Sequence, residues 1–206
     1  MTRITPLTVE ELPQETRDSL AYAQDLMGFT PNDVLTMAHW PELLGAMQTL
    51  VAVIYKPGAL DPTLKRMIAT IISGASGCRY CQAHTAHGAV KMAGADADKV
   101  AAVWEYQTSP LFSDAERAAL DLALAAGQQP NAATDDHFTQ LEEHFPKQAI
   151  MEIMGVISLF GFLNRWNDTL ATTLEAAPLD FAESNLRGKD WEAGKHKASR
   201  WSGEGI

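Results

Sequence analysis

The only two cysteines of this 206-residue chain, Cys78 and Cys81, lie three positions apart, and His84 follows three positions later. Residues three apart on a helix share one face, so the two sulfurs can close a disulfide if the local geometry allows it. The imidazole of His84 falls next to the second sulfur, where it can take the thiol proton. Two thiols and a base are the minimum set of groups for thiol-based redox chemistry.

Three other interpretations of the cysteine pair stay open at this point. Free cysteines are often small buried core residues. Cys78, Cys81, His84 and His87 are also zinc ligands by type, but steps of three on a helix turn by about −60° each and spread the four side chains around it. A thioredoxin-type motif follows a β-strand, whereas a helical pattern, 64–72, precedes Cys78.

Composition excludes several classes of partner. The formal net charge is −10, which argues against nucleic acid and anionic membrane surfaces as partners. The N-terminal residues do not read as a secretory signal, and the longest apolar run, 149–163, is interrupted by Glu152 and is too short to span a bilayer. We therefore expect a cytoplasmic protein with no membrane partner, in which a close cysteine pair is catalytic or metal-binding more often than structural.

Almost every segment has a helical pattern, and no run alternates long enough to predict a strand. The sequence predicts an all-α fold with one helical domain over 1–178 and a C-terminal docking tail over 179–206, where Trp191 and Trp201 would dock on this subunit or a neighbour. The helices are expected at 15–27, 41–55, 64–72, 78–94, 97–106, 113–126, 134–144, 146–162 and 164–174.

A faint internal repeat relates two parts of the chain. A shift of 86 residues places Glu152 on the position of Arg66, and it places asparagines on the positions of both cysteines. The apolar positions of 64–71 coincide with those of 150–157. This pattern predicts two similar helical halves packed about a pseudo-two-fold axis, only one of which carries thiols.

Several segments together resemble the carboxymuconolactone decarboxylase superfamily, and within it the alkylhydroperoxidase D-like, peroxidase-related branch. The likeness covers roughly residues 30 to 175, and its specific part is the setting of the cysteine pair. The segments that carry it are 60–65, 77–85, 93–94, 112–120, 144–145 and 164–167.

The resemblance implies an alkylhydroperoxidase D-like helical fold, no metal and no organic cofactor. It implies a homo-oligomer, a trimer or a hexamer built from trimers, that reduces an alkyl hydroperoxide at the expense of a dithiol reductant. It also implies that Cys81 attacks the peroxide and that Cys78 resolves the product as a disulfide. A helix N-terminus stabilises a thiolate, which favours Cys78 instead, but only Cys81 has a helical base beside it.

The chain departs from the family pattern at two positions. The best-known members carry a histidine four residues after the second cysteine, where this chain has Thr85, so His84 is expected to serve instead. They also carry a glutamate twelve residues before the first cysteine, where this chain has Arg66. The repeat offers Glu152 as the substitute carboxylate of the proton relay. Its structural alternative is an ion pair with Arg66 or Arg165.

Three functions therefore compete. The first is a thiol peroxidase that uses Cys81, Cys78, His84 and Glu152. The second is the family's lactone decarboxylase, whose chemistry needs no thiol pair. The third is a non-catalytic oligomer that senses redox state through its disulfide. His87 is expected either behind the site or on the surface.

Overall fold

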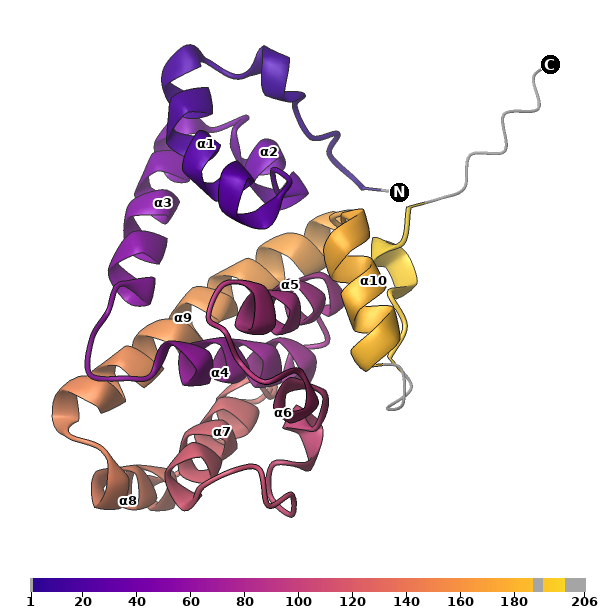
Figure 1. Cartoon of the computed structure of the whole chain (residues 1–206). Coiled ribbons are helices and arrows are strands. Elements are labelled where there is room, and N and C mark those ends of the chain that lie inside the picture. The colour runs from indigo at the N-terminus through magenta and orange to yellow at the C-terminus, as the bar shows by residue number, and fades with distance from the viewer. Residues whose placement is uncertain (1, 187–190, 199–206) are drawn as a thin grey trace.

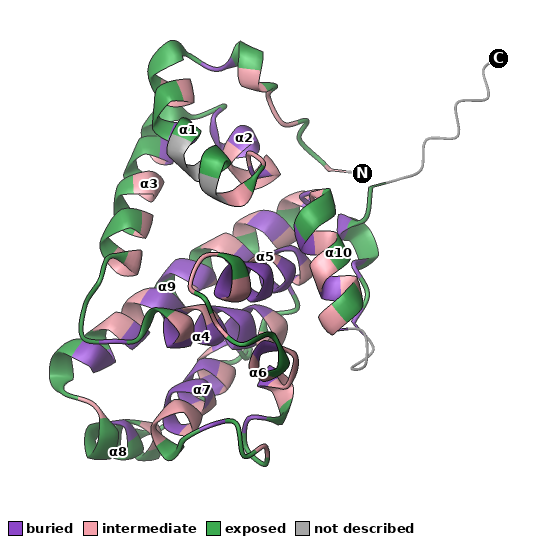
Figure 2. Cartoon of the chain, viewed as in Figure 1, coloured by how far each residue is buried: buried purple, intermediate pink, exposed green. Residues whose placement is uncertain are grey.

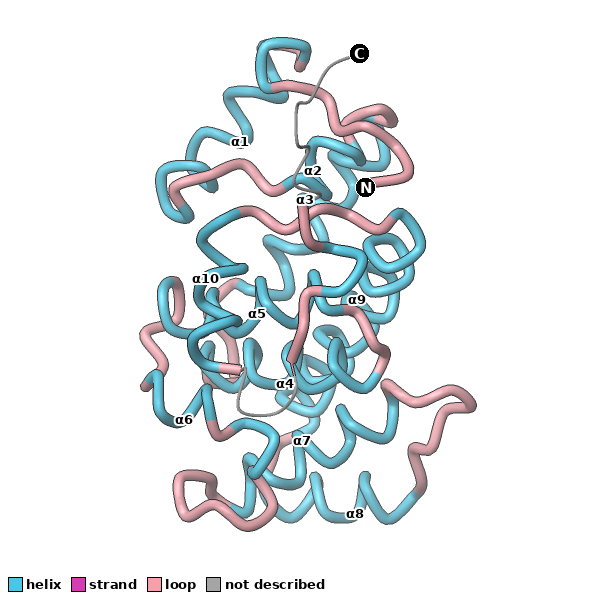
Figure 3. The backbone as a smooth tube through the Cα atoms, turned by 90° about the vertical axis from the view of Figure 1, so that its right-hand side faces the viewer, coloured by secondary structure: helices cyan, strands magenta, loops and turns pink. Residues whose placement is uncertain are grey.

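The all-α fold predicted from the sequence is confirmed in the computed structural model, which describes residues 2–186 and 191–198. Over these residues the chain is helical with no strand (Figure 3). Short 3-10 helices cover Val9–Glu11, Val103–Glu105 and Gly194–His196. The α-helices are α1 (Gln14–Met27), α2 (Asn32–Met37), α3 (Pro41–Tyr55), α4 (Pro62–Ala75), α5 (Arg79–Lys91), α6 (Ala97–Ala101), α7 (Asp114–Ala126), α8 (Asp135–His144), α9 (Lys147–Leu170) and α10 (Ala176–Asn185).

The turn between α4 and α5 places the cysteine pair. Asp61 caps α4 by accepting the backbone N–H groups of Thr63 and Leu64. The helix runs through Gly74 to Ala75, and the chain then turns at Gly77, whose φ of 76° lies in the left-handed region that glycine tolerates best. A new helix therefore starts immediately after Cys78.

The second half of the chain does not contain the matching turn. We predicted a break between 162 and 164, but α9 is one helix of 24 residues. The repeat explains the difference, because it places Leu163 on the position of Gly77. A leucine has no reason to leave the helical region there, so α9 continues where α4 and α5 are separate.

Helix α9 forms the axis of the fold, and α4, α5 and α7 pack around it (Figure 1). By length and composition α9 would be apolar enough to cross a membrane, but it contacts α3, α4, α5, α7 and α8 within the bundle. The purple surfaces of α4, α5 and α9 in Figure 2 mark the main core. The buried face of α9, which includes Ile153, Val156 and Leu159, belongs to the main core.

Helices α1, α2 and α3 form a separate lobe with a small core of its own (Figure 1). That core includes Leu12, Leu35 and Leu44, and Leu163 and Trp166 of α9 pack against it. This lobe brings α2, which the sequence did not predict, against the cysteine-bearing helix.

The described part of the predicted tail, 179–186 and 191–198, contains helical structure. Helix α10 packs on α5, so the boundary that we predicted at 178/179 falls inside a helix of the domain. Trp191 is buried in the main core of the same chain, as one of the two expected docking modes requires. Trp201 lies outside the described residues.

A close contact at Gly74 yields a test of the packing on α4. A Cβ at Gly74 would overlap the ring of Trp104, and moving that ring would disturb the core. We expect Gly74→Ala to lower the free energy of unfolding by roughly 1–3 kcal/mol, as overpacking does. The matched control is Gly45→Ala on the exposed side of α3, where nothing lies within 4 Å of the new Cβ. That change should leave stability equal or higher by up to about 1 kcal/mol. Chemical denaturation measures both, and equal effects would contradict the packing argument.

Candidate thiol site

The two thiols lie at the first turn of α5. Cys78 is the N-cap residue, and its Sγ accepts the backbone N–H of Cys81 at 3.5 Å. Both cysteines are reduced and buried. The short connection holds the sulfurs close together, where the positive end of the helix dipole stabilises negative charge.

The Cys81 sulfur faces α9. The side-chain amide of Asn167 donates to Cys81 Sγ at 3.3 Å and lies 3.2 Å from Oδ2 of Asp33. Burial raises the pKa of Cys81 well above its usual value, and the neighbouring Cys78 and Asp33 raise it further, while the Asn167 hydrogen bond lowers it. In this closed, reduced state Cys81 is therefore a neutral thiol. Asn167 is the group placed to stabilise the sulfur once it ionises.

His84 is paired with a carboxylate that the sequence did not predict. Its Nε2 lies 2.5 Å from Oε2 of Glu175, the N-cap residue of α10. The backbone N–H of Asn32 donates to Oε1 of the same carboxylate at 2.5 Å. Burial favours a higher pKa for Glu175, but the attraction and hydrogen bond of His84 outweigh it and leave the pKa lowered. Glu175 therefore holds the imidazole as an ionised partner.

Tyr80 joins this pair to the other buried acid. Its ring stacks on the His84 imidazole with centroids 4.3 Å apart. Its hydroxyl donates to Glu175 Oε1 at 2.9 Å and accepts the backbone N–H of Asp33 at 3.3 Å. Burial raises the pKa of Asp33, so this carboxyl is able to hold a proton beside the thiol. The polar groups form one connected series of His84, Glu175, Tyr80, Asp33, Asn167 and Cys81.

The prediction that Glu152 faces His84 is wrong in the structure. Its carboxylate lies 2.9 Å from Nζ of Lys65 and accepts the backbone N–H groups of Ala59 and Leu60. The ion-pair alternative is thus correct in kind, although the partner is a lysine and not an arginine. Side chains at equivalent positions of a repeat meet only if their helices cross there, and Glu152 lies at the opposite end of α9 from the thiols.

The Lys65 hydrogen bonds and charge lower the pKa of Glu152 from 4.5 to about 2. The folded chain then binds this proton less readily than the unfolded chain does. The contribution of the pair to the free energy of unfolding is therefore complete above pH 4.5 and is lost as the pH falls through 2. Because Lys65 is buried, the pair has a structural role between α9 and the start of α4.

His87 and Thr85 both lie inside the protein. The ring of His87 packs edge-on against Phe181 of α10, and burial together with the charge of His84 lowers its pKa. His87 is therefore not a surface residue. Thr85, in the slot of the family histidine, donates to the backbone oxygen of Cys81 at 2.8 Å. The described residues contain no group of three or more His, Cys, Asp or Glu side chains that could hold a metal ion.

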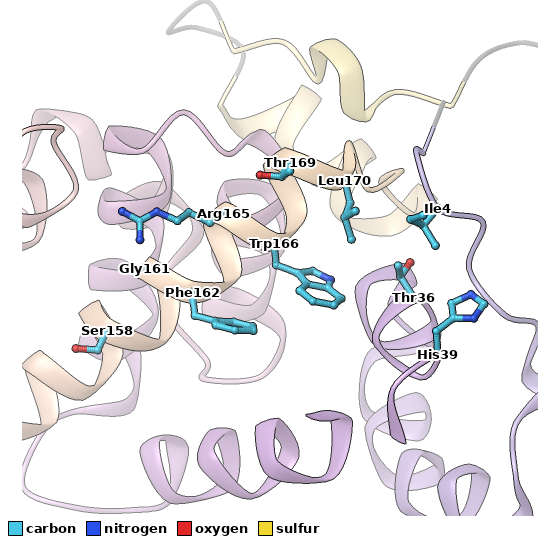
Figure 4. Close-up of a pocket in the computed structure, with 10 residues that line it drawn as sticks. All are labelled: Ile4, Thr36, His39, Ser158, Gly161, Phe162, Arg165, Trp166, Thr169 and Leu170. Carbon is cyan, nitrogen blue, oxygen red and sulfur yellow. The ribbon is translucent and has the colours of Figure 1, made fainter. Parts of the chain in front are cut away.

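A groove of about 780 Å³ lies on the other side of α9, away from the thiols. Figure 4 shows Phe162, Trp166 and Leu170 of α9 directed toward Ile4 and α2. The sulfur and carboxylate groups described above do not line it. This groove is lined by α9, α2 and the N-terminal segment and is distinct from the thiol site.

Comparisons with known proteins place the fold and the cysteine-bearing segment. The model of the carboxymuconolactone decarboxylase family matches residues 41–125, which carry both cysteines and His84. The chain is 34% identical over 115 residues to the uncharacterized protein YnjA of Escherichia coli (strain K12), an alignment that covers 56% of this chain and 63% of YnjA. The chain therefore spans less than two thirds of the length of this curated relative.

Solved structures cover nearly the whole fold. The apo debrominase Bmp8 is 36% identical with a TM-score of 0.82, over 89% of this chain and 97% of Bmp8. A cysteine-to-alanine variant of Bmp8 in complex with 2,3,4-tribromopyrrole is 35% identical with a TM-score of 0.83 over the same shares. An uncharacterized peroxidase-related protein with an AhpD core from Ralstonia eutropha JMP134 is 24% identical with a TM-score of 0.77, over 88% of this chain and 95% of that one, and supports the fold alone.

The two carboxylates can be separated by matched substitutions. In a Cys78→Ser background we expect Glu175→Gln to slow alkylation of Cys81 by iodoacetamide at neutral pH roughly tenfold, which equals about one unit of thiol pKa. The reason is that the imidazole loses its orienting anion. Glu152→Gln should leave the alkylation rate unchanged and lower the free energy of unfolding, because it leaves the buried Lys65 charge without a counterion. If Glu152→Gln slowed alkylation and Glu175→Gln did not, Glu152 would be the carboxylate of the relay.

Proposed function

The chain belongs to the carboxymuconolactone decarboxylase and alkylhydroperoxidase D-like superfamily, and we propose that it is a dithiol-dependent reductase of hydroperoxides. The observation that carries the proposal is the hydrogen-bonded series between the His84–Glu175 pair and the Cys81 sulfur. It connects a base, a buried acid and a thiol whose partner thiol lies in the same helical turn. Thiol-based reduction needs each of these groups.

In the first step, the Cys81 thiolate attacks the terminal oxygen of the hydroperoxide. The S–O bond forms as the O–O bond breaks, and the leaving alkoxide takes a proton from the relay to become an alcohol. Cys81 is oxidised to a sulfenic acid. Asn167 supports this step by donating to the sulfur while it is negatively charged.

In the second step, the Cys78 thiolate attacks the Cys81 sulfur. A disulfide forms, and hydroxide leaves and takes a proton to become water. An external dithiol then reduces the disulfide, so the net reaction converts one hydroperoxide and one dithiol into an alcohol, water and an oxidised dithiol. We propose that this takes place in the cytoplasm, where dithiol reductants keep thiols reduced.

Reductive debromination is the second candidate function. It is supported by the debrominase Bmp8, whose structure matches this chain over nearly its full length at 35–36% identity. The same two thiols balance this reaction: a bromoarene and two thiols give the arene with a new C–H bond, bromide, a proton and a disulfide. Hydroperoxide reduction and debromination thus differ in the substrate and share the thiol chemistry.

Substitution of each cysteine tests the proposed function. With dithiothreitol as reductant, we expect the wild-type protein to consume cumene hydroperoxide over many turnovers and Cys81→Ser to lose this activity. Cys78→Ser should undergo a single oxidation and accumulate a sulfenic acid at Cys81, which dimedone traps for mass spectrometry. A sulfenic acid trapped on Cys78 in the Cys81→Ser variant would mean that Cys78, and not Cys81, attacks the peroxide. Turnover of 2,3,4-tribromopyrrole but not of the hydroperoxide would favour debromination, and oxidation without turnover would favour a redox sensor.

We also propose that the protein is a homo-oligomer, a trimer or a dimer of trimers. Helix α3 is apolar, yet most of its ribbon is coloured exposed or intermediate (Figure 2). It buries only Leu44 and exposes Leu50 and Val53. Apolar side chains gathered on one exposed helix are typical of an interface. Light scattering at micromolar concentration should give three or six times the monomer mass. A monomer mass would contradict the proposal.

A further inference from the structure

Arg66 is a half-buried cation beside the thiol helix that is paired with no carboxylate among the described residues. Its guanidinium lies 4.0 Å from the centroid of the Tyr55 ring, and its Nη2 lies 3.5 Å from Sδ of Met92. An aromatic face and a thioether leave most of its five N–H donors without a protein acceptor among the described residues. Lys65, the preceding residue on α4, differs because it has Glu152 as its partner.

The backbone around Arg66 leaves room for this unpaired group. A Cβ on Gly88 of α5 would lie 3.2 Å from Nη1 of Arg66, closer than side chains normally approach. The glycine therefore lets the guanidinium lie directly against α5. On that helix Cys81, Gly88 and Met92 follow one another at spacings of seven and four, which places them on one face.

A second donor beside Arg66 is also unused. The hydroxyl of Tyr55 is buried and has no hydrogen-bond partner. Leaving such a group unpaired costs free energy of folding, so it needs an explanation. Burial raises the pKa of this hydroxyl, the charge of Arg66 lowers it, and the charge of an ionised Cys81 raises it. The charges of Arg66 and of an ionised Cys81 thus both act on the Tyr55 hydroxyl.

From this geometry we infer that Arg66 and the Tyr55 hydroxyl form a binding site for the anionic group of an organic substrate whose reducible atom reaches Cys81. The inference rests on the proposed function and adds a substrate class to it. A planar guanidinium with free N–H donors and an adjacent hydroxyl match a carboxylate in charge and hydrogen bonding.

The alternative role for Arg66, stabilising the Cys81 thiolate, has a different structural requirement. It needs the guanidinium at the sulfur, whereas the hydrogen bond to that sulfur comes from Asn167. Arg66 instead lies two turns farther along α5, beside Gly88 and Met92. That separation suits a group that holds one end of a substrate while the other end reacts.

Two hydroperoxides that differ only in charge test the inference. The probes are cumene hydroperoxide and its 4-carboxylate analogue, each assayed with dithiothreitol. We expect Arg66→Met to raise the KM for the carboxylate analogue about tenfold or more, as loss of charge-assisted hydrogen bonds does. The KM for the neutral probe and the kcat for both should stay unchanged. The matched control Arg165→Met removes an equal charge from an exposed position and should change neither KM.

Tyr55→Phe separates binding from structure. It keeps the ring under the guanidinium and removes only the unpaired hydroxyl, so the melting temperature should stay equal or rise while the KM for the carboxylate probe increases. An equal rise in KM for both probes, or no selective rise in KM for the carboxylate probe in either variant, overturns the inference. If the wild-type protein turns over neither probe, the proposed function fails by itself. Benzoate is then titrated into the reduced wild-type protein and into Arg66→Met, and binding is followed by NMR. Binding that is lost in the variant supports the anion site, and binding that is absent or unchanged overturns it.

Discussion

The buried contact between Cys81 and Asn167 is the constraint on which the site depends. A sulfur and an amide at the centre of a helical core need partners, because an unpaired polar group there costs free energy. The amide nitrogen of Asn167 donates to both the sulfur and Asp33, which connects α9 with both α5 and α2. The α1–α3 lobe is therefore attached to the thiol helix through polar groups, in addition to the apolar contacts of Leu163 and Trp166.

This contact also explains which parts of the site the sequence could reveal. The 86-residue shift places Asn167 on Cys81, and these two residues do meet across the centre of the fold. The same shift suggested Glu152, which fails because its helix end lies far from the thiols and beside Lys65. The repeat thus predicted the pairing of Asn167 with Cys81 and failed for Glu152.

The start of α7 at Ser113 was predicted correctly, because the partner of its cap lies within three residues, whereas α4 begins at Pro62, two residues before the predicted start at 64. Glu175 could not be found in this way. Its partner His84 is 91 residues distant, and no pattern in the chain relates the two. The one available signal was Pro178, which favours the first turn of a helix and would have pointed to α10 and to an acidic N-cap before it.

The two sides of Cys81 differ in a way that bears on function. On one side, His84, Glu175, Tyr80 and Asp33 are fully connected by hydrogen bonds, as expected for groups that move a proton. Farther along α5, the buried Tyr55 hydroxyl beside Arg66 has no hydrogen-bond partner among the described residues. A folded chain tolerates unpaired buried donors when something else supplies the acceptor during function. The family position that holds a glutamate in the relay of the best-known members is thus occupied here by a cation. In the proposed function Glu175 of α10 supplies the carboxylate of the relay, and the proposed role of Arg66 is to bind the substrate.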